Sequence, residues 1–90
     1  MVVHCGDDCT NPASDSVIAL TLAEQLLNDA GLGTCWGGYF HRASQKCDAL
    51  RAMLNLPEGH QVYGVLMVGH PDEHFPRDPY RPAATIHWVE

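Results

Sequence analysis

Residues 17–40 read VIALTLAEQLLNDAGLGTCWGGYF, an apolar run that ends abruptly in glycines and aromatic residues. The first part of this stretch has helical spacing. The residues that share one apolar stripe are Ala19, Leu22, Ala23, Leu26 and Ala30. Further aliphatic side chains widen the stripe until the first half of the helix is apolar nearly all round, which is typical of a helix buried on more than one side. We therefore predict a buried central helix over 17–30, capped by Asp15 or Ser16.

The second part of the stretch carries two different signals. Gly31 stands where a glycine commonly ends a helix, and Leu32 is placed for the hydrophobic contact that accompanies such an end. The following segment, Trp36-Gly37-Gly38-Tyr39, is not needed to stop the helix. Its glycines could offer backbone N–H groups with no Cβ in the way, and Trp36 or Tyr39 could wall a planar ring. A dinucleotide-binding fingerprint is excluded, because Gly-x-Gly follows a helix here rather than a strand.

Short strands and one more helix are predicted on either side of this stretch. Val2 and Val3 indicate a strand at the start of the chain, and a second short helix is expected over 44–55, where Pro57 prevents its continuation. The run 62–69 is too apolar for an exposed edge, so it indicates a central strand covered on both faces.

The segment 70–90 is different, because it contains four prolines among polar residues. We expect an extended arm that cannot join the middle of a sheet, with a short terminal strand over 84–89. Such an arm has little to pack on within 90 residues, so it suggests contact with a neighbouring subunit. The prediction is one α+β domain over 1–90 in which 70–90 is the arm.

Charge and hydropathy restrict the class of partner. Five Lys and Arg residues against eleven Asp and Glu give a net charge of −6, so no basic cluster can follow a nucleic-acid backbone. No apolar run is long enough to span a bilayer, and the first residues do not have the pattern of a signal peptide. We therefore expect a cytoplasmic protein with no nucleic-acid or membrane partner.

The four cysteines permit disulfides, but the absence of a secretion signal favours reduced thiols. A metal site through His4, Cys5 and Cys9 is the alternative, although no second pair of ligands with suitable spacing follows. No side chains form a convincing catalytic constellation, since the six histidines are scattered and no nucleophile elbow is present. If the protein is an enzyme, a cofactor carries the chemistry.

Four stretches, taken in order, resemble the C-terminal half of the FMN-dependent nitroreductase family. They are GLGTCWGGYF at 31–40 behind an Ala/Leu-rich helix, LRAMLNLPEGH at 50–60, VYGVLMVGHP at 62–71, and Arg81-Pro82 followed by Trp88. Each stretch alone is a weak signal. Their order and spacing together are specific and cover nearly the whole chain.

The resemblance implies an α+β fold and a homodimer with FMN at the subunit interface, where the C-terminal arm embraces the partner. It also implies that NAD(P)H reduces the flavin and that the flavin reduces a nitroaromatic or quinone-type acceptor. In the matching loop, the backbone N–H that binds flavin N5 falls at Gly38, with Gly37 and Tyr39 as alternatives and Trp36 beside them.

The resemblance further implies that Arg81 binds the FMN phosphate, a role that suits a guanidinium group. Arg77 is the one residue that could replace a second basic group of the family. The family segment that holds the rest of FMN belongs to the N-terminal half, so we expect a second copy or a companion chain to complete the site. The alternative is a non-catalytic truncated remnant or a dimeric interaction module.

Overall fold

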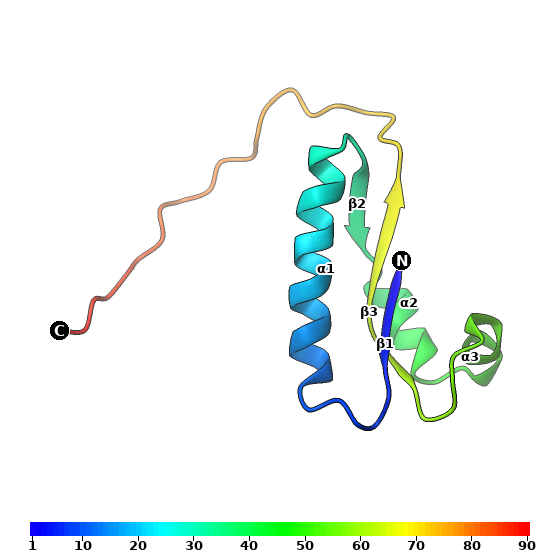
Figure 1. Cartoon of the computed structure of the whole chain (residues 1–90). Helices are drawn as coiled ribbons and strands as arrows, with labels where there is room; N and C mark the ends of the chain where they lie inside the picture. Colours follow the sequence, from blue (N-terminus) through cyan, green and yellow to red (C-terminus); the bar gives the residue numbers. More distant parts are fainter.

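Helices and strands occupy the chain up to Gly69 in this computed structural model, which describes all residues 1–90. The strands are β1 (Val2–Cys5), β2 (Gly33–Trp36) and β3 (Gln61–Gly69). The helices are α1 (Pro12–Asp29), α2 (Gly38–Ser44) and α3 (Asp48–Leu54). This arrangement confirms the α+β fold class, and Figure 1 shows α1 lying along the small sheet on the left of the strands, with α2 and α3 on their right.

The sheet is antiparallel and has the order β1-β3-β2, so β3 is the central strand that its apolar sequence predicts. The prediction that β3 is covered on both faces is wrong for its last three residues, 67–69, which are exposed. Val2 pairs with Val65 on one side of β3, and Trp36 pairs with Leu66 on the other. The amino group of Met1 extends the first ladder, because it donates to the carbonyl oxygen of Leu66 at 2.8 Å. Both neighbours of β3 are therefore fixed in register by backbone hydrogen bonds.

The core lies where α1 crosses β3. Leu20 and Leu66 are fully buried, and Val62 and Val65 are nearly so. The terminal carbon of Leu20 occupies the position where a Cβ on Gly64 would lie, so the missing side chain lets α1 approach the strand closely. This contact explains a glycine in the middle of an otherwise β-branched and aliphatic strand.

The C-terminal end of α1 has the form that its sequence predicts. Gly31 adopts a left-handed conformation with φ of 81°. The Gly31 N–H donates to the carbonyl of Asn28 at 3.0 Å, and the Leu32 N–H donates to that of Leu27 at 2.9 Å. These two bonds define a Schellman motif, which satisfies carbonyl groups at the helix end and turns the chain directly into β2.

Two predictions about α1 are wrong. The helix begins at Pro12 with Asn11 as its N-cap, one turn before the expected caps Asp15 and Ser16, because proline is well suited to the first turn of a helix. The helix is also not buried on several sides, since Ser16 and Leu20 are its buried residues. A sheet of three strands covers one face of α1, and the opposite apolar face remains exposed.

The region after β2 also differs from the sequence prediction. The glycine-rich segment is the end of β2 and the start of α2 rather than a loop, and the second predicted helix over 44–55 is limited to α3. His41 Nε2 and Gln45 Nε2 both contact the carbonyl oxygen of Val62, at 3.1 Å and 2.7 Å. These tertiary hydrogen bonds hold α2 against β3 and compensate for its short length.

The terminal strand predicted over 84–89 does not form. Residues 70–90 contain neither helix nor strand and extend away from the body of the chain (Figure 1). A strand needs a neighbour for its backbone hydrogen bonds, and none lies beside this segment.

No helix in the structure is both long and apolar enough to cross a bilayer.

The cysteines contradict the prediction that all four thiols are reduced. Cys5 and Cys9 form a disulfide across the turn between β1 and α1, whereas Cys35 and Cys47 are free and exposed. Cys5 and Cys9 are four residues apart, and their Cα atoms lie 6.4 Å from each other, which is within disulfide range. The bond also occupies both thiols that a metal site with His4 would need. The cytoplasmic location expected from the sequence stays a prediction.

The contact between Leu20 and Gly64 predicts that replacing each of two glycines of β3 by alanine changes the stability of the protein to a different extent. Gly64→Ala should lower the free energy of unfolding by about 1–3 kcal/mol, because the new methyl group meets a fully buried side chain. Gly69→Ala is the matched control, since nothing lies within 4 Å of its added Cβ, and it should change stability by less than about 0.5 kcal/mol. Urea denaturation measures both values, and equal effects would contradict the packing described above.

Candidate functional site

The segment Trp36-Gly37-Gly38-Tyr39 forms the junction between β2 and α2. Gly37 is buried, and its N–H donates to the carbonyl of Val65 at 2.9 Å. A Cβ added to Gly37 would lie 2.9 Å from the Cγ1 atom of Val65, which is closer than side chains pack. Gly37 therefore fixes the junction to the central strand, and its N–H is not available to a ligand.

The next two residues present their backbone outward. The first hydrogen bond of α2 runs from the His41 N–H to the Gly37 carbonyl, so the N–H groups of Gly38, Tyr39 and Phe40 have no partner within the helix, and those of Gly38 and Tyr39 lie nearest to Trp36 in the chain. No atom lies within 4 Å of an added Cβ on Gly38. A ligand can therefore approach this backbone directly, and two N–H groups can donate to it.

A carboxylate on α1 holds the aromatic residue beside these donors. The indole Nε1 of Trp36 donates to Glu24 Oε2 at 3.3 Å, and the Thr34 hydroxyl donates to Glu24 Oε1 at 3.1 Å. Asn28 Nδ2 donates in turn to the Thr34 oxygen at 3.1 Å. Thr34 and Trp36 are alternate residues of β2, so their side chains lie on the same face, toward α1. Glu24 thereby links the orientation of the indole ring to the position of the helix.

Two surface pockets share the Trp36–Gly38 junction. One has a volume of about 360 Å³ and is lined by Trp36, Gly38, Tyr39 and Arg42. The other has about 240 Å³ and lies toward α1 and β3, with Val17, Tyr63 and Val65 among its lining residues. The first pocket is in the size range of small-molecule sites. The junction is therefore accessible on two sides, one of them with a cation and one mostly apolar.

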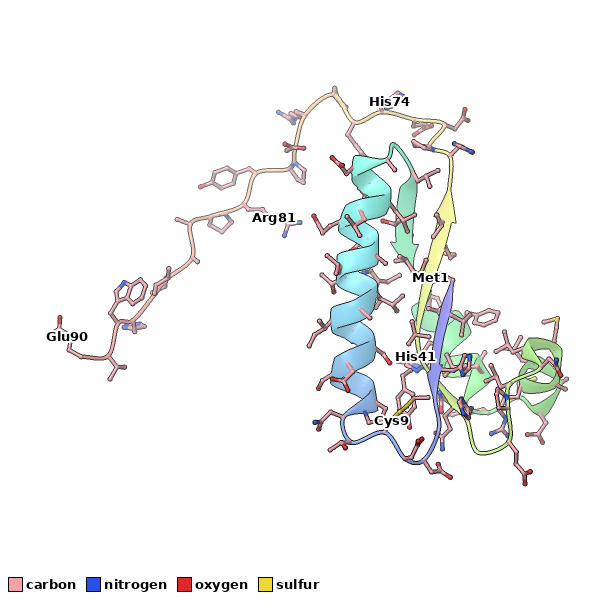
Figure 2. The ribbon with its side chains drawn as sticks, viewed as in Figure 1. Met1, Cys9, His41, His74, Arg81 and Glu90 are labelled. Atoms are coloured by element: carbon pink, nitrogen blue, oxygen red, sulfur yellow. A yellow bond between two sulfur atoms is a disulfide. The ribbon has the colours of Figure 1, made fainter.

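The structure does not bring every predicted site residue to this junction. Arg77 and Arg81 belong to the arm, which diverges from the body of the chain (Figure 2). The pocket that includes Arg77 is lined otherwise by Phe75, Pro76 and Pro79, all of the same arm. A single chain thus assembles the Trp36–Tyr39 group but not the two arm arginines.

Two residues near the junction were not predicted from the sequence. Arg42 lies four residues after Gly38, and helical spacing puts both on one side of α2, so recognising this helix would have found it. Glu24 lies twelve residues before Trp36, on another element, and no local pattern connects them.

His4, the histidine of the predicted metal site, lies in a separate cluster with His60. His4 Nδ1 and His60 Nδ1 are 2.8 Å apart, beside the turn that the Cys5–Cys9 disulfide closes. No group of three or more metal-ligating side chains is present around them or elsewhere in the structure. These histidines link the end of β1 to the start of β3, and they are distinct from the Trp36–Tyr39 junction.

The fold and the junction define a class of protein: an α+β domain with an exposed backbone edge between aromatic side chains. The family model described as "Nitroreductase family" matches residues 7–70, more than two thirds of the chain. The chain therefore belongs to the nitroreductase family, as its sequence motifs predict, although the motif at Arg81-Pro82 and Trp88 lies outside the matched residues. Membership points to an oxidoreductase-type function in a family that is generally flavin-dependent. Comparison with curated proteins and with solved structures gives no match.

The hydrogen bonds of Glu24 predict how Trp36 responds to substitution. In a Trp88→Phe background, where Trp36 is the one tryptophan, Glu24→Leu should increase quenching of its emission by acrylamide and lower stability by about 1 kcal/mol. Glu24→Gln keeps an acceptor for the indole and should restore most of the protection. Identical quenching in all three proteins would show that Glu24 does not orient the ring.

Proposed function

We propose that this chain provides the flavin-contacting edge of an FMN-dependent reductase that oxidises NAD(P)H and reduces nitroaromatic or quinone-type acceptors. The observation that carries this proposal is the pair of unpartnered N–H groups on Gly38 and Tyr39, next to Trp36 and open to solvent. Bound FMN would accept hydride from the nicotinamide and pass electrons to the acceptor.

The residues of the junction fit the ring portion of such a cofactor. An isoalloxazine ring is flat and carries hydrogen-bond acceptors on its edge, so it needs backbone donors and aromatic or apolar walls. Gly38 supplies the donor with the most open approach, and Tyr39 supplies the next one. Trp36 and Tyr39 are 41% and 92% exposed, which leaves their ring faces free to contact a planar ligand.

The two arm arginines that we expect to bind the phosphate of FMN do not lie at the junction within one chain. We propose that Arg81, with Arg77 beside it, reaches the site of a second copy through the arm, or that a companion chain completes the site. The exposed apolar residues support this idea. On the arm these are Phe75, Tyr80, Ile86, Trp88 and Val89, and on α1 they include Ile18, Leu22 and Leu26. Large exposed apolar patches of this kind mark interaction surfaces.

A non-catalytic dimeric module is the second candidate function. The same exposed face of α1 favours it, because such a module needs an apolar contact surface but no cofactor. Cofactor binding separates the two candidates, since both would form a dimer.

The primary experiment is titration of the purified chain with FMN, followed by flavin absorbance and fluorescence. We expect saturable binding that perturbs the flavin bands. Gly38→Val should weaken this binding about tenfold or more, because the side chain would fill the open space next to the donors.

Gly69→Val is the control, since the space around Gly69 is equally open but lies at the far end of β3. Flavin bands that stay unchanged as FMN is added would contradict flavin binding by this chain without a companion chain and would favour the non-catalytic module. Normal FMN affinity in Gly38→Val would remove Gly38 from the site while leaving flavin binding intact.

The proposed dimer predicts the molecular mass of the protein in solution and how truncation of the arm lowers it. Light scattering should give twice the mass of one chain, and removal of residues 83–90 should shift the protein toward monomer because three exposed apolar side chains of the arm are lost. Leu22→Asp on the exposed face of α1 should have the same effect without shortening the chain. Circular dichroism confirms that each variant is folded. A folded wild-type monomer at high concentration would contradict self-association and leave the companion chain as the route to a complete site.

A further inference from the structure

Arg42 is the cation that the structure places in the pocket at the junction. It lies in α2, one helical turn after Gly38, and lines the 360 Å³ pocket with Trp36, Gly38 and Tyr39. The remaining lining is therefore two aromatic side chains and one open stretch of backbone. This composition offers flat apolar surface next to one positive charge.

The guanidinium group of Arg42 has no partner within the chain. The structure contains one salt bridge, which joins Arg51 to Asp48 on α3, and no hydrogen bond from the Arg42 side chain is formed. Arg42 shares this lack of a salt bridge with three of the other four basic residues, but it is the one basic residue that lines a pocket together with Trp36 and Tyr39. A guanidinium group in this setting suits a carboxylate, which it can bind with two parallel hydrogen bonds.

We infer that Arg42 makes this pocket selective for aromatic acceptors that carry an anionic group. The inference rests on the proposed function and specifies its substrate class. The Tyr39 ring, which is 92% exposed, contacts the flat body of the acceptor, and Arg42 binds its carboxylate or a similar anion, while Trp36 and the Gly38 backbone are left to the flavin. A neutral acceptor of the same shape keeps the contact with the aromatic ring but loses the interaction with Arg42.

The test compares 4-nitrobenzoate with 4-nitrobenzamide, which differ in charge but share the ring and the nitro group. In the FMN-loaded protein, the KM for the benzoate should be about 3- to 10-fold lower than that for the benzamide, the range expected for a charge contact that remains partly exposed to water. Arg42→Gln should abolish this difference by raising the KM of the benzoate alone. Lys46→Gln is the matched control, because it removes an equal charge just beyond α2 at a residue that does not line the pocket.

A second measurement does not depend on flavin. Both compounds quench tryptophan emission, so their binding can be followed on Trp36 in the Trp88→Phe protein with and without FMN. A preference for the benzoate that disappears in Arg42→Gln supports the inference. Equal affinities in the FMN-loaded wild type would overturn it while leaving the proposed function in place. If FMN does not bind at all, the proposed function fails, and the quenching titration without flavin then decides the inference.

The anion that Arg42 binds could instead be the phosphate of the cofactor, and riboflavin distinguishes this source. If Arg42→Gln weakens FMN but not riboflavin, the guanidinium group serves the cofactor phosphate and the selectivity for anionic acceptors is refuted. Equal affinities for FMN in wild type and variant, together with the lost preference for nitrobenzoate, assign Arg42 to the acceptor.

Discussion

The position of α1 on the sheet depends on one close contact, that of Leu20 with Gly64. Because Gly64 has no side chain, the fully buried side chain of Leu20 packs directly against the backbone of β3, and α1 lies close to the sheet. Glu24 lies four residues after Leu20, so it projects from the same face of α1. The contact that builds the core therefore also brings the carboxylate within reach of Thr34 and Trp36. Core packing and site geometry share a single origin.

Three consecutive residues of the junction between β2 and α2 have different roles. Trp36 turns toward α1 and bonds to Glu24, Gly37 bonds to Val65 of the central strand, and Gly38 begins α2 with its N–H group free. The two glycines have opposite surroundings: a side chain on Gly37 would collide with Val65, whereas one on Gly38 would meet nothing. The first glycine serves packing and the second leaves room for a ligand. A sequence of two adjacent glycines between aromatics is explained by this division.

Local patterns in the sequence predicted several elements well. The central strand, the first strand, the helix end at Gly31 and the α+β class all follow from apolar runs and turn residues, and the structure confirms them. The start of α2 was missed, because a helix that begins with Gly38 and depends on hydrogen bonds from His41 and Gln45 to Val62 has no local signal. Arg42 was missed for the same reason. The burial of α1 was overestimated, since its apolar face has no cover within one chain.

The central claim is that the Gly38 backbone, and not that of Gly37, faces the flavin. Chemical-shift perturbation of ¹⁵N-glycine-labelled protein during FMN titration tests it most directly, because the chain contains eight glycines and each gives one amide signal. Our account predicts a large shift for the Gly38 amide and a small one for Gly37, whose N–H remains bonded to Val65. The opposite pattern, or shifts confined to glycines far from the junction such as Gly6 and Gly59, would contradict it.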